Sequence, residues 1–298
     1  MPMTRAETTP EARSASLLLP RPSLATCVVL GIVRDTRGRT LAHGDRFNHF
    51  PLSPYCSLTW HFEGRLHLVK TDAEAKAPET GAPLPRLMVS GPGSGPVTTW
   101  SAGPVFVLTV SFYPDVWEAL TGTSVLPLFD KHVAGENVLP PDVVETLLPV
   151  FREGSAEQRF ARFEEQIAPR WAHRRPKGGV SPFWMRDWAT ALAARAALSS
   201  TGRSLRQLQR RVKHQTGRTQ RELALLVRNE ELFARVMSDE PGTAPDHAGL
   251  AVDAGFADQA HMIREVRRMT GMPPARILRL IATEESYWPY RLLGMRYG

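Results

Sequence analysis

The chain has 298 residues, of which 42% are hydrophobic and 22% are charged, and its formal net charge is +7. This length exceeds what one hydrophobic core usually serves, so we expect about two domains. The two cysteines, Cys27 and Cys56, are too few for a disulfide framework, and no apolar run approaches the roughly 20 residues of a membrane span. These features predict a cytoplasmic protein that does not enter a membrane.

The positive charge is concentrated in the C-terminal part of the chain. Residues 174–298 hold 21 Lys and Arg against 12 Asp and Glu, whereas residues 1–173 hold 16 against 18. A basic region attached to a slightly acidic one is typical of a nucleic-acid reader joined to another domain. The alternative is a basic surface that serves only solubility.

The N-terminal segment 1–23 is rich in Thr, Ser, Arg, Pro and Ala, with a single apolar cluster at 17–19. This cluster is too short for the apolar core of a secretory signal, so we predict a disordered leader.

Short segments rich in β-branched and aromatic residues follow the leader, and turn-forming residues such as Glu63 and Gly64 separate them. The predicted strands are 25–33, 57–62, 65–69, 86–90 and 105–112. Several short strands at this spacing predict a small barrel or sandwich, and we assign residues 24–172 to this β-rich domain with trailing helices.

Aromatic side chains in this region offer walls for a small organic effector, namely Trp60, Phe62 and Trp100. The same residues serve equally well as ordinary core. Because side chains alternate along a strand, Trp60 and Phe62 share one face while His61 takes the other.

No catalytic or metal-binding set emerges from the sequence. Histidines occur at positions 43, 49, 61 and 67, close to Cys56 and Glu63, but the spacing of His61, Glu63 and His67 does not match a metal-binding cupin. Ser, His and Asp residues show no arrangement typical of a catalytic triad. We therefore predict no metal, no cofactor and no enzymatic activity.

Residues 155–167 carry helical periodicity, with Phe160, Phe163 and Ile167 on one face. This stripe packs on the β domain or pairs with its copy in a dimer, and the sequence leaves both interpretations open. The charged, proline-broken and glycine-ended segment 173–180 is the predicted interdomain linker.

The C-terminal part contains two amphipathic helices, each of which ends in Thr-Gly. In 204–217, Leu205, Leu208 and Val212 form an apolar row, opposite polar and basic residues, and Ser204 is the predicted N-cap. In 255–271, the apolar row is Met262, Val266 and Met269. A third periodic segment, 220–237, predicts a continuous connecting helix.

These motifs resemble the DNA-binding domain of AraC/XylS-type transcription regulators. The resemblance rests on Gly255-Phe256, on Thr270-Gly271 followed by two prolines, and on the earlier Thr216-Gly217, and it covers residues 181–282. It implies an α+β protein, with a cupin-like β-barrel sensor followed by an all-α domain, 181–285, of two helix-turn-helix units joined by a long helix, and a tail, 286–298. It also implies double-stranded DNA, a small-molecule effector, RNA polymerase and a second copy in a homodimer as partners.

The resemblance carries the groove-facing positions onto this chain. The implied base-reading residues are Arg206, Gln209, Arg210, Gln259, His261 and Arg264, since Arg bonds guanine edges and Gln adenine edges. Arg211, Lys213, Arg267 and Arg268 lie nearer the helix ends and are the implied phosphate contacts. The alternative for each residue is a solvated helix face. A rigid connector lets one chain read successive major grooves, which lie about 34 Å apart.

Some positions depart from the family pattern. Only one helix, 182–199, is predicted before Ser204, and the second scaffold helix carries His247 and Gly249. Ala257 replaces a hydroxyl residue before the second recognition helix, where Asp258 supplies a capping carboxylate instead. In a second hypothesis, the β domain is a protein-docking module and a partner protein exerts the regulation.

Overall fold

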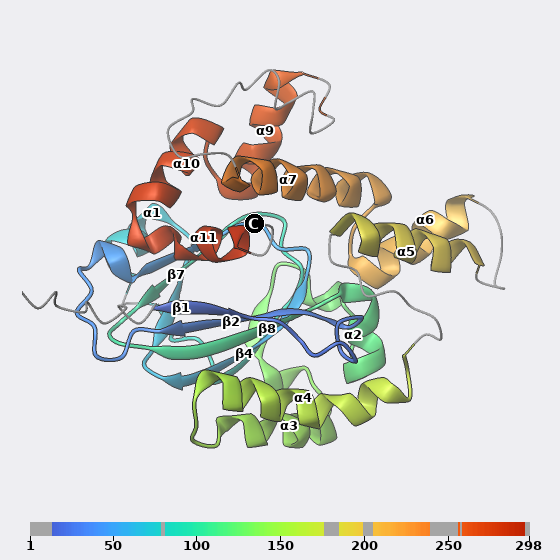
Figure 1. Cartoon of the computed structure of the whole chain (residues 1–298), viewed down its shortest axis with the longest axis horizontal. Coiled ribbons are helices and arrows are strands. Elements are labelled where there is room, and N and C mark those ends of the chain that lie inside the picture. The colour runs from blue at the N-terminus through green and yellow to red at the C-terminus, as the bar shows by residue number, and fades with distance from the viewer. Residues whose placement is uncertain are drawn as a thin grey trace, which may run out of the picture.

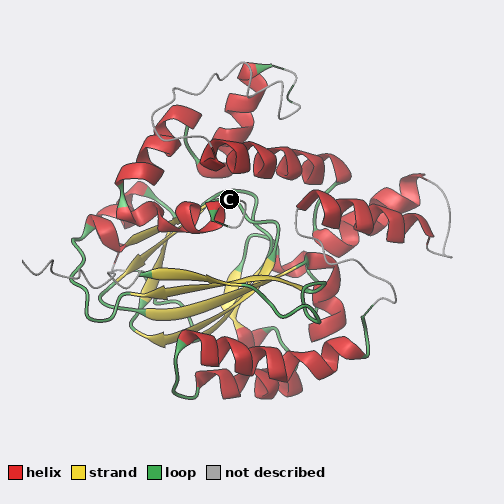
Figure 2. Ribbon diagram, in the orientation of Figure 1, coloured by secondary structure: helices red, strands yellow, loops and turns green. Residues whose placement is uncertain are grey.

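A computed structural model of the chain describes residues 14–78, 81–175, 185–198, 205–238, 256 and 258–295. The N-terminal part is built on β-sheets and the C-terminal part is helical, which confirms the predicted α+β organisation (Figure 2). The sheets form a central layer, with α3 and α4 on one side and α7, α9, α10 and α11 on the other (Figure 1).

The strands form two antiparallel sheets. One is six-stranded, in the order β1-β2-β8-β4-β6-β9, and the other is three-stranded, in the order β3-β7-β5. The strands are β1 (Ala15–Leu18), β2 (Val28–Asp35), β3 (Phe47–Phe50), β4 (Cys56–Glu63), β5 (Leu66–Val69), β6 (Leu87–Ser90), β7 (Val97–Ser101), β8 (Phe106–Phe112) and β9 (His132–Ala134). Among the described residues no strand pairing joins the two sheets, so they do not close into the expected barrel.

The prediction of a disordered leader is wrong for residues 15–18. Ala15–Leu18 form β1, which pairs along its length with β2 at the edge of the larger sheet. Leu17 and Leu18 pack against the hydrophobic core. Backbone pairing and this contact together order a segment whose composition alone predicts disorder. Residues 1–13 lie outside the described part of the chain.

The N-terminal helices include α1 (Asp72–Lys76), α2 (Pro114–Thr121), α3 (Pro141–Leu147) and α4 (Ala156–Ala172). The apolar stripe of α4 packs on the larger sheet: Phe160, Phe163 and Ile167 are buried, and the Phe163 ring lies 5.7 Å from that of Trp60. The stripe is therefore core, and its assignment to a dimer interface is wrong.

The helical part consists of α5 (Met185–Leu198), α6 (Leu205–Thr216), α7 (Gln220–Ser238), α9 (Gln259–Thr270), α10 (Pro274–Thr283), a 3-10 turn (Glu285–Tyr287) and α11 (Trp288–Gly294). Both predicted amphipathic helices and the connecting helix are present. Ser204, Ala257, the turn 200–203, the second scaffold helix with His247 and Gly249, and the linker beyond residue 175 lie outside the described residues.

The two parts of the chain share one hydrophobic core. Val212 of α6, Leu226 of α7 and Met269 of α9 belong to the same buried cluster as the strands of the larger sheet. The backbone amide of Leu52 also donates to the carbonyl of Met269 at 2.8 Å. The helical part is thus packed onto the sheets as part of one folded body.

The segment 284–294 joins the second helical unit to the sheets. On one side, Tyr287 and Tyr290 lie in a buried cluster with residues of α9 and α10. On the other side, the indole N–H of Trp288 donates to the Asn48 side chain at 2.8 Å. The Glu285 carboxylate accepts a hydrogen bond of 2.7 Å from Arg34, whose side chain is only 4% exposed.

We expect Glu285→Gln to lower the free energy of unfolding by about 2 kcal/mol, because it leaves the buried Arg34 guanidinium without its counter-charge. Glu63→Gln is the matched control, since Glu63 pairs with Arg37 at an exposed site and its loss costs under about 1 kcal/mol. Urea unfolding measures both. Equal losses in the two variants would contradict a special role for the Arg34–Glu285 pair.

His49 makes the same interface sensitive to acid. Its ring stacks on Tyr287 at 4.6 Å, and burial lowers the pKa of His49 to about 4. The unfolded chain binds this proton near pH 6.5 and the folded chain does not, so stability falls as pH drops from about 6.5 toward 4, by up to about 3 kcal/mol. Urea unfolding between pH 7 and 5 should show a shallower pH dependence for His49→Gln than for the wild type.

Candidate functional site

Helix α6 presents a polar and basic face to solvent. The side chains of Arg206, Gln209 and Arg210 are exposed, whereas Val212 is buried and Leu208 packs against the core. The predicted base-reading residues of this helix therefore lie together on its free face, at its N-terminal end.

Helix α9 repeats this arrangement. Gln259 and Arg264 are exposed, while Met262 and Val266 are buried in the second core cluster. His261 is half-buried, and the edge of its ring meets that of Phe256 at 5.6 Å. Gln259 and Arg264 are therefore accessible to solvent, and His261 is the least accessible of the three predicted residues.

The residues predicted to contact phosphates differ in whether their side chains already bond to other groups of the protein. Lys213 and Arg267 are exposed. Arg268 forms ion pairs with Glu222 at 3.5 Å and with Glu265 at 3.9 Å. Arg211 donates to the carbonyl oxygen of Ala196 in α5, so its guanidinium already has a structural role.

Both helices end in the same way. Gly217 and Gly271 adopt φ values of +72° and +77°, and each amide donates to the carbonyl four residues earlier. The threonine before each glycine donates to a carbonyl in the last helical turn and accepts from the amide two residues later. The Thr-Gly pair therefore ends both helices through one repeated hydrogen-bond pattern.

The start of α9 is fixed by Asp258. Its carboxylate accepts from the backbone amide of His261 at 2.6 Å, which confirms the predicted cap. Because an N-cap satisfies an amide that has no partner within the helix, this residue sets where α9 begins and so where Gln259 lies.

The two helices lie near opposite ends of α7 (Figure 1). The first helix is also held to the N-terminal part, because α6 packs against α2 and against the turn Leu126–Leu128. Beside it, the guanidinium of Arg218, 1% exposed, donates to the carbonyl of Gly93 and lies 5.3 Å over the Phe129 ring. A side chain at Gly217 would also collide with Phe129, its Cβ lying 2.8 Å from the ring.

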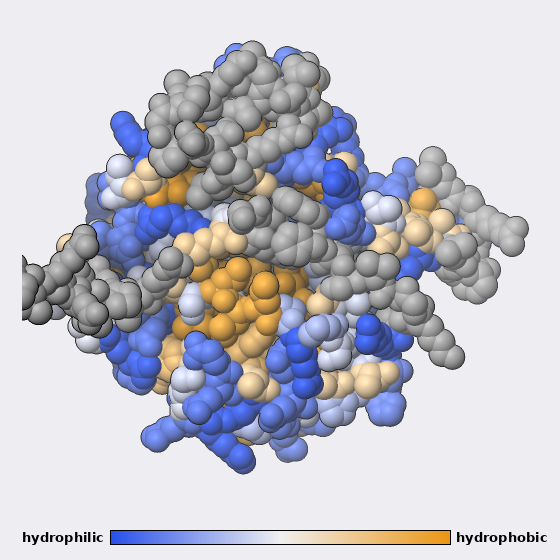
Figure 3. Space-filling model, in the orientation of Figure 1, coloured by the Kyte–Doolittle hydropathy of each residue, from blue (hydrophilic) through white to orange (hydrophobic). Residues whose placement is uncertain are grey.

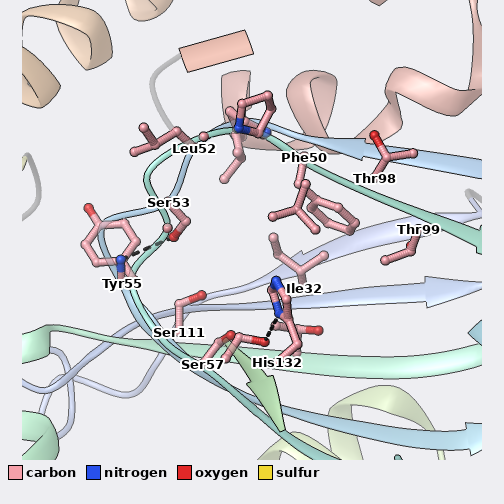
Figure 4. A pocket seen from close by; sticks show the side chains of 18 of the residues that line it. Ile32, Phe50, Leu52, Ser53, Tyr55, Ser57, Thr98, Thr99, Ser111 and His132 are labelled. Atoms are coloured by element: carbon pink, nitrogen blue, oxygen red, sulfur yellow. Dashed lines mark hydrogen bonds between the residues drawn. The ribbon is translucent and has the colours of Figure 1, made fainter. Parts of the chain in front are cut away.

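A cavity of about 660 Å³ lies between the two sheets and the helical part. Ile32 and Phe50 contribute apolar walls from the strands, and Leu226, Phe233 and Met269 from α7 and α9. Figure 4 shows Ile32 and Phe50 on one side of the space and polar side chains on another. The cavity thus touches α9 and the connecting helix α7, but not α6.

One wall of this cavity is a row of polar side chains that crosses the larger sheet. Ser111 on β8 is paired in register with Ser57 on β4, Ser57 with Ser90 on β6, and Ser90 with His132 on β9. All four residues line the cavity, and the Ser90 hydroxyl bonds to His132 Nδ1 at 2.8 Å (Figure 4). We call these four residues the serine row.

The histidines of this wall carry no charge at neutral pH. Burial lowers the pKa of His61 and that of His132. His61 Nδ1 lies 2.6 Å from the Pro85 carbonyl, so this nitrogen carries the proton and donates. The wall consequently offers hydroxyl groups and neutral imidazoles.

The three predicted effector residues lie outside the cavity lining. Trp60 points to the other face of β4, where its N–H donates to the Leu147 carbonyl at 3.3 Å. Phe62, on the same face, packs against Phe106. Trp100 lies against His67, at 6.1 Å between rings. Strand alternation puts the bulky residues of β4 toward the helices and its small polar ones toward the cavity.

The four histidines noted in the sequence are dispersed. His61 bonds to Pro85, His67 to the Gly81 carbonyl and His49 to Thr98, and His43 packs against Phe47. Across the described ranges, no three His, Cys, Asp or Glu side chains gather as a metal site would require. None of the helices described there has the length and apolarity needed to cross a bilayer.

The surface agrees with this division of the chain. In the view of Figure 3 the outer helices show mostly hydrophilic residues, and hydrophobic residues gather in the middle of the face, over the strands below α11.

Comparison with known proteins identifies the helical part. Residues 192–279 match the model of a helix-turn-helix domain family, of the AraC type. This match spans α6, α7 and α9, so the C-terminal region is an AraC-type helix-turn-helix domain. No curated protein sequence matches the chain.

Among solved structures, the chain is similar to ToxT of Vibrio cholerae. A lysine-to-alanine variant of apo ToxT from strain SCE256 is 11% identical, with a TM-score of 0.39 over 84% of this chain and 96% of that one. ToxT of strain O395 bound to (E)-4-(8-methylnaphthalen-1-yl)but-3-enoic acid is 11% identical, with a TM-score of 0.37 over 90% and 100%.

We expect Asp258→Ala to weaken the first turn of α9 by about 1 kcal/mol, because the amide of His261 loses its acceptor. Hydrogen exchange should then accelerate at the first amides of α9 and stay unchanged in α4. The control is Ser155→Ala, which removes the corresponding cap of α4 and should give the reverse pattern. Unchanged exchange at α9 in Asp258→Ala would show that the cap does not set the start of this helix.

Proposed function

We propose that this chain, whose residues 192–279 are an AraC-type helix-turn-helix domain, is a one-component transcription regulator that binds double-stranded DNA through α6 and α9. The observation that carries the proposal is the repeated pair of helices. Each buries an apolar row, exposes an Arg- and Gln-bearing face and ends on the same Thr-Gly pattern.

In this proposal the exposed faces read base edges. Arg206 and Arg210 suit guanine, which presents two acceptors in the major groove, and Gln209 suits adenine. Gln259 and Arg264 have the same roles in the second unit. His261 contributes less, because its ring is half-buried against Phe256.

Phosphate contacts fall to the free cations at the helix ends. Lys213 and Arg267 are exposed and suit this role. Arg268 must give up ion pairs with Glu222 and Glu265 to reach a phosphate, and Arg211 must give up its bond to Ala196. We therefore assign the main phosphate contacts to the first two residues.

The cavity supports a small-molecule effector over control by a docked protein. Its volume of about 660 Å³ lies within the usual range for small-molecule pockets. Because α7 and α9 form part of its wall, a molecule bound there contacts the DNA-reading part directly. Homodimerisation, contact with RNA polymerase and a cytoplasmic location belong to the proposal as implications of the family resemblance.

The test begins with selection of bound fragments from genomic DNA by the purified protein. On the selected site, Arg264→Ala should weaken binding by about 1–3 kcal/mol and relax the preference at one base pair, because a base-edge contact is lost. Arg267→Ala should weaken all sequences alike and reduce the slope of log affinity against log salt by about 1. Fluorescence anisotropy across a salt series measures both effects.

Glu145→Gln, on an exposed position of α3 in the N-terminal part, is the control and should bind as the wild type does. If both arginine variants lost affinity uniformly for all sequences, Arg264 would have no base-reading role. If no fragment were selected, the DNA-binding proposal itself would fail.

A further inference from the structure

We propose that the cavity binds an uncharged, largely apolar molecule whose hydroxyl or carbonyl group meets the serine row. The inference rests on the proposed effector-binding function and specifies the chemical class of the effector. The observation behind it is that hydroxyl groups from three neighbouring strands line up across one wall of a space that is also lined by many apolar side chains.

Two of these hydroxyls are free to bind a ligand. Ser90 already bonds to His132. Within the described part of the chain, the hydroxyls of Ser57 and Ser111 bond to no other protein group, and both side chains are partly exposed to the cavity. A hydroxyl both donates and accepts, so the pair Ser57 and Ser111 suits an alcohol or a carbonyl oxygen equally well.

The neighbouring wall reinforces this polarity without adding charge. At the next pair on the same face of these strands, the hydroxyls of Thr59 and Thr109 bond to each other at 3.0 Å. These two groups satisfy one another and leave Ser57 and Ser111 as the open positions. Within this polar wall, Ser57 and Ser111 therefore form the small region where one polar group of a ligand can make hydrogen bonds.

The charged groups of the lining disfavour an anion. Two carboxylates, Asp130 and Glu230, and one ammonium, Lys70, belong to it. Lys70 and Asp130 are exposed, whereas Glu230 is buried and accepts from the amide of Met185 at 2.7 Å. A carboxylate on the serine row would lose its water without gaining a cation beside it, which is costly. A ligand ammonium at the same place would meet only neutral groups.

The rest of the cavity suits an apolar body. Besides the serine row, the lining includes Ile32 and Phe50 of the sheets and Leu226, Phe233 and Met269 of the helical part. A molecule held by its polar group at the row therefore lays its apolar end against α7 and α9. In this binding mode the polar group of the ligand is recognised by the serine row, and a different part of the ligand contacts α7 and α9.

The test uses three ten-carbon probes that differ only in the head group: decan-1-ol, decanoate and decylammonium. Isothermal titration with the full chain at pH 7 should show the tightest binding for decan-1-ol. The double variant Ser57→Ala/Ser111→Ala should bind decan-1-ol about 3- to 10-fold more weakly, because it removes the hydrogen-bond partners of the head. Ser16→Ala, on edge strand β1 outside the cavity lining, should leave the affinity unchanged.

Circular dichroism is used to check that each variant folds. If the double variant does not fold, the single variants Ser57→Ala and Ser111→Ala replace it. Tighter binding of decanoate that is lost in Lys70→Ala would overturn the proposal and place the head at the rim. Tighter binding of decylammonium, or an unchanged affinity in the serine variants, would also overturn it. Each of these three results leaves effector binding intact, whereas failure of all three probes to bind counts against the cavity as the sensing site as well. DNA binding, measured on the same preparations, is tested independently.

Discussion

The alternation of side chains along β4 and β8 is the constraint on which both the hydrophobic core and the cavity wall of the N-terminal part depend. On one face of these strands, Trp60 and Leu108 are buried toward α4, where Phe163 packs against the indole ring. On the other face, Ser57 and Ser111 look into the cavity. One register therefore builds a dense core and a polar-walled space at once, and a shift by one residue would exchange the two.

The core shared by the sheets and the helical part has a consequence for regulation. Leu226 and Met269 pack in the same cluster as the strands and also line the cavity. A ligand in that space contacts residues whose positions depend on how the helical part is seated. Such a ligand shifts the equilibrium between two positions of the helical part only by as much as its affinity differs between them. The contacts with Leu226 and Met269 are where this difference in affinity arises.

Local patterns in the sequence were enough to predict α6, α7 and α9, because a helix is specified by neighbours three and four residues apart. Asp258 and the two Thr-Gly pairs were equally readable, since a cap acts within one turn. The serine row was not. Its members come from strands that are neighbours in the sheet but not in sequence, so Ser57, Ser90 and Ser111 meet only once the order β8-β4-β6 is known. Alternation of Ser57 and Thr59 with Leu58 and Trp60 was the available signal, whereas the predicted effector residues Trp60 and Phe62 lie on the face of β4 away from this cavity.

Helices α6 and α9 are held by different anchors, and in the proposed function this asymmetry bears on how the domain meets DNA. The first is seated by Arg218, whose buried guanidinium reaches Gly93 and Phe129 of the N-terminal part. The second is tied to the sheets through Glu285 and Trp288, at positions beyond the residues that match the helix-turn-helix model. Rigid contact with two successive grooves requires that both helices keep one spacing. That spacing is set here by α7 together with the sheets on which both ends are anchored, so in the proposed function a ligand bound between the sheets and the helices would act on the element that fixes the spacing.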